Sequence, residues 1–324
     1  MPGLSIVIPN YNGSELLRRY LPSVLDAAEQ AGAGEVLLVD DASSDNSLEV
    51  AGNVSGSVKI VARETNGGFG EAVNTGAGQV SSDDYMAVLM TDIQMEPDAL
   101  VRALEVLSEP GVFAAGLDLR TDQDCGNSGV ISLPFRRGLY HTSFPDVEKP
   151  GTWNREPHHI AFAMGGAMVL RKSIFDQLGG FSSIYAPYFW EDVDIGWRAW
   201  KMGYRSVSVP EAIAWHRHPH KTIESSEKRH RIDQVVFRNR MRFISANITD
   251  RRILRQHRFW KLLMLLKRRM RSNDPFVAAC REVSAPNQPR YRIEKTKVSD
   301  WGLTRFLDQP RSIGELPWEW GENG

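Results

Sequence analysis

LSIVIPNYNGSELLRRYLPSVLDAAEQAGAGEVLLVDDASSDNS, residues 4–47, places two short apolar runs on either side of one longer amphipathic segment. The runs LSIVIP and EVLLVDD have the length and aliphatic content of buried strands, whereas the segment from Glu15 to Glu29 repeats its apolar residues with helical spacing. A strand, a helix and a second strand in this order predict a parallel βαβ unit. Each strand is followed by a polar sequence, PNYN or DDASSDNS, which we expect at its carboxyl end.

The same alternation continues as far as residue 108. The runs VKIVAR and YMAVLM are predicted strands, and residues 47–54, 70–80 and 97–108 are predicted helices. We therefore predict an α/β fold with a doubly wound, mostly parallel sheet flanked by helices. In open sheets of this kind ligands bind at the carboxyl ends of the strands, where PNYN, DDASSDNS, NGGFG and MTDIQ fall.

The rest of the chain is less regular. Residues 121–158 are rich in turns and show no sustained period. Beyond them the sequence predicts a strand in HIAFAMGGAMVLRKS, a short helix over 174–178, and strands in YRSVSVP and over 212–216. Two long helices, over 224–248 and 251–271, form a predicted helical C-terminal extension, and the pattern of residues 284–324 assigns no element.

Composition and charge exclude several classes of protein. The chain has 324 residues, 42% hydrophobic and 24% charged, which is typical of a globular protein with one large domain or two. Its net charge of -1 argues against a nucleic-acid-binding protein. Cys125 and Cys280 show no metal spacing and fit a reducing compartment. The N-terminus lacks the basic region of a signal peptide, and no apolar run approaches the roughly 20 residues that cross a bilayer. We therefore expect a cytoplasmic protein.

Two of the polar loops have an ordinary alternative to ligand binding. The glycine-rich loop carries Gly68 and Gly70, but Val73 stands where the dinucleotide fingerprint needs a third glycine. Asp40 and Asp41 end a strand, where such residues either stabilise a turn or accept hydrogen bonds from a ribose or a base. Neither loop by itself decides between ligand binding and a purely structural turn.

Residues of the types that bind metal ions follow two other predicted strands. Asp92 follows YMAVLM and offers a hard oxygen ligand to Mg²⁺ or Mn²⁺ bridging the phosphates of a nucleotide. His216, His218 and His220 follow the last predicted strand, where they form either a metal or phosphate contact or a titratable surface strand.

The stretch YFWEDVDIGWRAW, residues 188–200, gathers three carboxylates between aromatic side chains. Acidic residues at a helix start complement the helix dipole, which accounts for Glu191, Asp192 and Asp194 without any ligand. It does not account for the three rings of residues 188–190. We interpret these rings as faces on which a ligand stacks.

In order and spacing these pieces resemble the inverting nucleotide-sugar glycosyltransferases of family 2, and most of all their bacterial rhamnosyltransferase-like branch. The resemblance covers roughly residues 4–245 and rests on the ordered set SIVIPNYNG, LLVDDASSDNS, NGGFGEAVNTG, VLMTDIQMEPDAL, MGGAMVLRKSIFDQLGGF, YFWEDVDIGWRAWKMGY and VSVPEAIAWHRH. It implies a catalytic domain of the GT-A fold over residues 1–222, with a nucleotide-binding half over about 1–120 and an acceptor half over about 121–222. Residues 223–324 would form the helical C-terminal region and tail.

The resemblance also implies a role for individual residues. Asp192 matches the catalytic base and Glu191 its acidic neighbour. Asp92 matches the last Asp of the family's Asp-x-Asp metal motif, and His216 matches a position that completes the metal site in some members. The nucleotide-sugar pocket is assigned to Pro9, Asn10, Tyr11, Asp40, Asn66, Gly68 and Phe69.

Met90 is the clear departure from the family pattern, which usually has Asp or Asn there. A thioether is a weak ligand for hard cations, so we expect Mg²⁺ or Mn²⁺ to bind weakly without nucleotide. The expected activity is inverting transfer of a sugar from a UDP- or dTDP-linked donor to a hydroxyl of a glycan or glycolipid acceptor. The alternative is a catalytically silent protein that binds a sugar nucleotide or glycan on the same scaffold.

The second C-terminal helix, residues 251–271, carries nine Lys or Arg residues and no acid. Its apolar residues fall on one face, which either packs on the core or lies in a membrane interface beside anionic lipid at the inner face of the cell membrane. Both alternatives are open at this point. No base-reading module accompanies the charge, so nucleic acid is not an expected partner.

Overall fold

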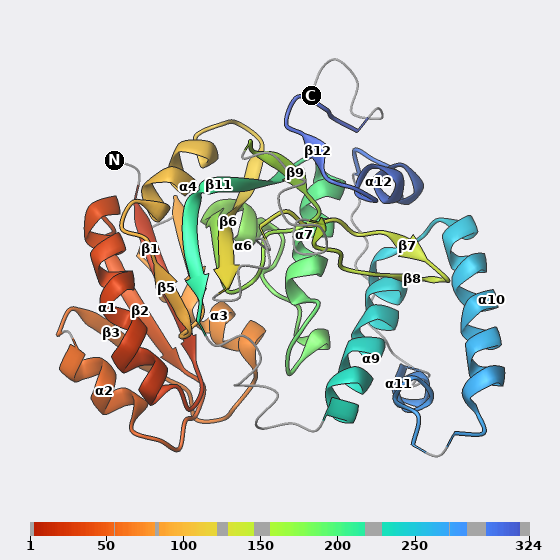
Figure 1. The fold of residues 1–324 in the computed structure, drawn as a ribbon, viewed down its shortest axis with the longest axis horizontal. Helices are drawn as coiled ribbons and strands as arrows, with labels where there is room; N and C mark the ends of the chain where they lie inside the picture. Colours follow the sequence, from red (N-terminus) through yellow and green to blue (C-terminus); the bar gives the residue numbers. More distant parts are fainter. Residues whose placement is uncertain are drawn as a thin grey trace.

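The computed structural model describes residues 3–54, 56–81, 84–121, 129–145, 156–217, 229–271, 273–283 and 296–317. Within these residues, one twisted sheet of ten strands occupies the centre and helices cover both of its faces (Figure 1). His218, His220 and the predicted boundary at residue 222 lie outside the described residues. The predicted α/β architecture is confirmed.

The sheet is parallel in its first half and mixed in its second. The strand order is β12-β9-β11-β6-β10-β4-β1-β2-β3, with β5 paired to β11. Strands β1 to β4 pair in parallel, and β10 is antiparallel to both β4 and β6. The strand bounds are β1 Leu4–Asn10, β2 Glu35–Asp40, β3 Val58–Ala62, β4 Tyr85–Leu89, β5 Ile93–Met95, β6 Val112–Thr121, β9 His158–Ile160, β10 Ala167–Arg171, β11 Arg205–His216 and β12 Arg311–Ser312.

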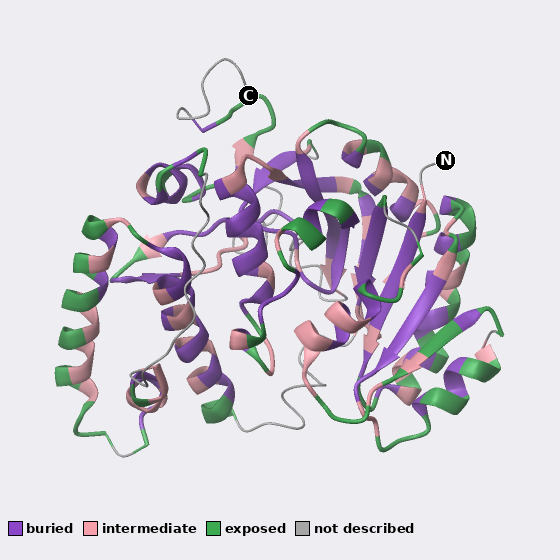
Figure 2. Cartoon of the chain, turned by 180° about the vertical axis from the view of Figure 1, so that it is seen from behind, coloured by how far each residue is buried: buried purple, intermediate pink, exposed green. Residues whose placement is uncertain are grey.

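Alternating side chains of the strands supply two separate cores. On β1, Ile6 and Ile8 join the cluster beneath α1, α2 and α4, whereas Val7 joins the cluster beneath α3, α6 and α7. Figure 2 shows the strands of the sheet buried between these layers. The helix bounds are α1 Ser14–Ala31, α2 Ser47–Val54, α3 Phe69–Ala77, α4 Ala99–Leu107, α6 Lys172–Gln177 and α7 Glu191–Met202. Helices on both faces confirm the doubly wound prediction.

The stretch HIAFAMGGAMVLRKS, predicted as one strand, forms two. Its first residues lie in β9 beside β11, and its last residues lie in β10 between β4 and β6. The two glycines between them, Gly165 and Gly166, interrupt the strand pattern and lie beside the candidate site described below.

The C-terminal region packs on the second half of the sheet. Helix α9, Arg229–Asn247, contacts α7, the 3-10 turn η1, Ser183–Tyr185, and the hairpin of β7, Phe135–Arg136, with β8, Leu139–Tyr140. Helices α10, Arg251–Arg268, and α11, Pro275–Val283, follow, and α11 packs on α9. The predicted helical extension is thereby present.

An element that the sequence did not predict joins the tail to α7. Helix α12, Asp300–Phe306, begins with a buried carboxylate that pairs with Lys201 Nζ at 2.8 Å. The same carboxylate accepts the backbone N–H groups of Thr249 and Asp250, where α10 begins. One buried acid therefore holds three parts of the C-terminal half together.

The predicted apolar face of residues 251–271 does not pack on the core. Its five residues are all exposed, from 44% for Leu263 to 87% for Met270, whereas another side of α10, with Ile253, Leu254 and Leu265, does pack there. Figure 1 shows α10 at the edge of the molecule, with α9 and α11 on its inner side. The core-packing alternative is therefore wrong for this face. In the described part of the chain, no helix is long and apolar enough to cross a membrane.

Candidate active site

Asn10 and Asp40 meet at the carboxyl ends of β1 and β2. They are opposite each other in the register, and Asn10 Nδ2 donates to Asp40 Oδ1 at 2.7 Å. Ser43 adds two hydrogen bonds to the same carboxylate, from its backbone N–H and from Oγ. Pro9 precedes this pair, and Tyr11 follows it with 47% of its surface exposed. The structure thus brings four of the predicted pocket residues to one edge of the sheet.

Asp41 holds the glycine-rich loop against this edge. Its carboxylate accepts the N–H of Gly67 at 3.0 Å and that of Gly68 at 2.7 Å, and it lies 3.3 Å from Arg63 Nε. Sequence reasoning missed this role, although two adjacent acids at a strand end were a signal that one of them points inward. Asn66, which is exposed, also accepts the N–H of Gly68.

The loop reaches from the nucleotide edge to the segment before α7. Gly68 has a φ of 86°, and a Cβ there would lie 2.3 Å from the carbonyl oxygen of Pro187, so both conformation and space favour glycine. Phe69 donates its N–H to the same carbonyl, and its ring packs on that of Phe181. A small hollow lined by Gly67, Gly70 and Glu191 lies between this loop and the start of α7. The predicted residues Asn66, Gly68 and Phe69 therefore connect the two halves of the site.

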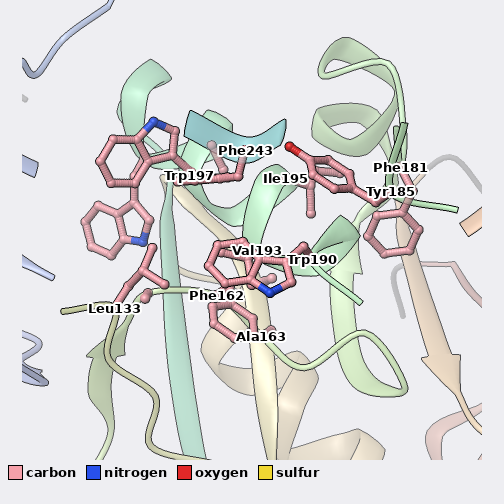
Figure 3. Close-up of a cluster of buried hydrophobic side chains, with 14 of the residues drawn as sticks. Leu133, Phe162, Ala163, Phe181, Tyr185, Trp190, Val193, Ile195, Trp197 and Phe243 are labelled. Atoms are coloured by element: carbon pink, nitrogen blue, oxygen red, sulfur yellow. The ribbon is translucent and has the colours of Figure 1, made fainter. Parts of the chain in front are cut away.

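The turn before α7 is strained and held by a buried amide. Phe189 and Trp190 have φ of 70° and 82°, values that such side chains rarely adopt. Asn239 of α9 donates to the carbonyls of Tyr185, Tyr188 and Phe189 within 3.0 Å. Figure 3 shows the indole of Trp190 inside the cluster with Val193 and Phe162. Trp190 is 4% exposed, so our interpretation of all three rings as stacking faces is wrong for this one.

Asp192 and Glu191, the first residues of α7, have contrasting surroundings. Asp192 accepts the N–H of Gly165 at 3.0 Å and that of Val193 at 2.8 Å. Glu191 is 7% exposed, and its Oε2 is buried with no hydrogen-bond partner among the described residues. Burial, followed by the charge of Asp192, raises the pKa of Glu191 to about 8.

Burial also raises the pKa of Asp192, but its two backbone hydrogen bonds oppose that rise. The N–H groups of Gly165 and Val193 stabilise the ionised form of Asp192, whereas the buried Glu191 favours its protonated form.

Asp194, the third carboxylate of the stretch, is structural. It is fully buried and accepts hydrogen bonds from Tyr185 Oη at 2.8 Å, Arg198 Nε at 2.7 Å and Asn247 Nδ2 at 2.7 Å. These partners tie α7 to η1 and to the end of α9. Two of the three acids are thus left for chemistry.

Asp92 and His216 meet because β5 pairs with the end of β11. Asp92 Oδ2 lies 2.9 Å from His216 Nε2, and Asp92 Oδ1 is buried without a partner among the described residues. Met90 donates its N–H to Gly166, and its side chain fills the space over that glycine. No group of three or more metal-ligating side chains gathers in the described ranges. Asp92 and His216 are two possible ligands, and Asp92 Oδ1 has an acceptor site to spare. They fit a hard cation whose remaining ligands include a phosphate group.

Comparison with known proteins identifies the family. A family model described as Glycosyl transferase family 2 matches residues 5–179, more than half of the chain. The chain belongs to glycosyl transferase family 2. A curated relative, the N-acetylglucosaminyl-diphospho-decaprenol L-rhamnosyltransferase of Mycobacterium tuberculosis, is 29% identical over 240 residues, covering 68% of this chain and 77% of the relative.

Solved structures support the same fold for this glycosyltransferase. The mannosyltransferase PcManGT of Pyrobaculum calidifontis, in complex with GDP-Man and Mn²⁺, aligns with a TM-score of 0.57 and 17% identity over 88% of this chain and 75% of that one. GalNAc-T7 with UDP, GalNAc and Mn²⁺ aligns with a TM-score of 0.58 and 17% identity over 75% of this chain. This chain spans 48% of the GalNAc-T7 chain. The GT-A fold is thereby confirmed.

Proposed function

We propose that this glycosyltransferase moves a sugar from a UDP- or dTDP-linked donor to a hydroxyl of a glycan or glycolipid acceptor, with inversion at the anomeric carbon. The observation that carries the proposal is the contact between the glycine-rich loop at the nucleotide edge and the turn that precedes α7. Asp41 holds Gly67 and Gly68, Gly68 lies against Pro187, and α7 starts four residues later with Glu191 and Asp192. The nucleotide edge and the carboxylate pair are therefore built as one unit.

The proposed reaction is a single displacement. Asp192 removes the proton of the acceptor hydroxyl while that oxygen forms a bond to the anomeric carbon and the bond to the nucleoside diphosphate breaks on the opposite face. Asp192 ends protonated, and the diphosphate leaves with the electron pair. Glu191 keeps its own proton throughout, so it does not compete as a base at neutral pH.

The donor is assigned to the edge formed by Pro9, Asn10, Tyr11 and Asp40, with the loop of Asn66, Gly68 and Phe69 beside it. Asp40 and Asn10 supply oriented polar groups for the base and ribose, and the exposed Tyr11 offers a ring face. The relative's name supports a lipid-linked acceptor, because it names a diphospho-decaprenol carrier.

A panel of nucleotide sugars tests the proposal against a catalytically silent binding protein, the alternative that Met90 favours. We expect thermal stabilisation by UDP or dTDP compounds and slow hydrolysis of one donor. Stabilisation without turnover of any donor, with or without an acceptor, would favour the silent protein. An unchanged melting temperature with every nucleotide would reject both.

Asp92 and His216 would hold a Mg²⁺ or Mn²⁺ ion together with the donor's diphosphate. When bound, such an ion neutralises charge that develops on the leaving diphosphate. Two protein ligands are few, so metal and nucleotide are expected to bind cooperatively, each raising the other's affinity by the same factor.

Calorimetric titration of Mn²⁺ with and without UDP or dTDP measures this coupling. Asp92→Ala is expected to remove most of it, because the buried carboxylate is the stronger ligand of the two. Met90→Asp adds a second carboxylate and is expected to strengthen binding without nucleotide. Tight binding of Mn²⁺ to the nucleotide-free wild type would contradict this account.

Helix α10 is proposed to lie on an anionic membrane surface. Phe259, Leu262, Leu263, Leu266 and Met270 form an exposed apolar row. Exposed basic residues flank the row, among them Arg258, Lys267, Arg269 and Arg271. An apolar row with basic flanks is complementary to acyl chains beneath anionic headgroups. This contact would bring the enzyme to a lipid-linked acceptor.

Vesicle binding tests this contact. Replacing Lys267, Arg269 and Arg271 by Glu is expected to weaken binding to vesicles with anionic lipid by about 100-fold or more, since attraction is worth about 1 kcal/mol per basic residue. Arg268 is left in place because it pairs with Asp274. The control replaces the exposed Arg18 and Lys59, on the opposite side of the molecule, by Glu, and it should have little effect on vesicle binding. Equal binding by all three forms would reject the membrane contact.

A further inference from the structure

Arg240 of α9 is a largely buried cation that the proposed reaction leaves unused. Its Cζ lies 5.8 Å from the centre of the Trp190 ring, and its Nε is buried without a hydrogen-bond partner in the described part of the chain. No carboxylate among the described residues pairs with it, whereas Arg238, two residues earlier, lies 3.5 Å from Glu282. Burial lowers the pKa of Arg240. An unpaired buried charge is costly, so its retention indicates an anionic ligand.

Two further arginines belong to the β7–β8 hairpin, which contacts α9: Arg136 ends β7, and Arg137 follows it in the turn. Arg136 and Arg137 are both exposed, and His141 follows the hairpin. The pKa of His141 is lowered first by burial and then by the positive charges of Arg240, Arg136 and Arg137. His141 Nε2 lies 3.2 Å from the carbonyl oxygen of Arg136, and Tyr140, the residue before His141, packs on Phe243, one helical turn from Arg240. The hairpin therefore lies along the part of α9 that carries Arg240.

This cationic cluster, Arg136, Arg137, His141 and Arg240, lies beside the start of α7. Trp190, over which Arg240 extends, directly precedes Glu191 and Asp192. Asn239, the neighbour of Arg240, fixes the turn that leads into this pair. An anion held by the cluster would therefore lie next to the carboxylate that receives the acceptor's proton. The donor's diphosphate is assigned elsewhere, to the glycine-rich loop and Asp92.

We propose that the cationic cluster binds a phosphate or diphosphate group of the acceptor. The inference rests on the proposed glycosyl transfer for its biological ligand, and its test is separate from that of the donor site. Arg240 supplies a planar guanidinium that fits phosphate oxygens in pairs, and Arg136 and Arg137 add charge from the hairpin. The acceptor sugar would then be positioned through the group that links it to its carrier.

Titration with inorganic pyrophosphate tests the site directly. The protein is first saturated with UDP or dTDP, so that the donor site is occupied, and a second titration is run without nucleotide. The ring protons of His141, followed by NMR, report on the cluster, because a bound anion raises the pKa of the imidazole. Arg240→Gln removes the central charge, Arg240→Lys keeps it, and Arg255→Gln on the exposed side of α10 is the control.

We expect pyrophosphate to bind nucleotide-loaded wild type and to shift His141. Arg240→Gln should weaken this binding about tenfold or more, the loss expected for a charged hydrogen bond. Arg240→Lys should recover part of the affinity, and Arg255→Gln should change it less than about twofold. Nucleotide affinity should be the same in all four forms.

Equal pyrophosphate affinity in wild type and Arg240→Gln, or no shift of His141 at saturation, would overturn the inference. Loss of vesicle binding by Arg240→Gln without any change in pyrophosphate affinity would assign the cluster to lipid headgroups and would overturn it too. Failure of wild type to bind UDP or dTDP would instead refute the donor assignment, because the titration without nucleotide still measures the cluster.

Discussion

Asp192→Asn is expected to lower the rate of glycosyl transfer by about 10²- to 10⁴-fold, the usual cost of removing a positioned general base. Donor affinity should stay nearly unchanged, because Asp192 acts on the acceptor hydroxyl. The amide oxygen of Asn can still accept the N–H of Gly165 or Val193, so the fold should be intact. Steady-state rates with a saturating donor, together with nucleotide titrations, measure the two quantities.

Glu191→Gln is the matched control for this substitution. Glu191 carries a proton at neutral pH because burial raises its pKa to about 8, so the neutral amide resembles the native state. We expect a much smaller loss of rate than in Asp192→Asn. The acid limb of the wild-type pH profile should lie above 3.8, the ordinary pKa of aspartate, because the pKa of Asp192 is raised. If Asp192→Asn kept near-normal turnover and Glu191→Gln were inactive, Glu191 and not Asp192 would be the general base.

Asp194→Ala is expected to lower the free energy of unfolding by about 3–5 kcal/mol, the cost of breaking a buried ion pair by removing one partner. Arg198 is 3% exposed and would be left without its carboxylate, and Tyr185 and Asn247 would each lose an acceptor. Denaturant unfolding measures the change.

Asp98→Ala is the control for the ion pair. Asp98 pairs with Arg102 at the same spacing along a helix, but both side chains are 40% exposed or more. Exposed pairs of this kind contribute less than about 1 kcal/mol. Equal losses in the two variants would show that the Asp194 network contributes no more than a surface pair.

Local periodicity was sufficient to predict the first half of the fold. Each strand from β1 to β4 is a short apolar run, and each helix between them repeats its apolar residues at helical spacing. Polar residues at strand ends therefore identified Asn10 and Asp40 as neighbours before any contact was known. The order of strands beyond β4 depends on long-range pairing, which local sequence does not carry. For this reason β9 and β10 were predicted as one strand.

The different roles of the carboxylates of α7 could not be predicted from the sequence. Asp192 and Asp194 differ only in the partners that distant segments bring to them: Gly165 for the first, Tyr185 and Asn247 for the second. The burial of Trp190 likewise depends on α9, and the role of Asp300 depends on contacts to Lys201 and Thr249. Residues of the same type at similar spacing thus acquire different roles through tertiary contacts.

The configuration of the product at the anomeric carbon tests the central claim most directly. The donor identified in the nucleotide-sugar panel is incubated with the enzyme and an alcohol acceptor, and the resulting glycoside is examined by NMR. Our account predicts a single product whose anomeric configuration is opposite to that of the donor, and its absence with Asp192→Asn. A product that retains the donor's configuration would contradict the single displacement and the role assigned to Asp192.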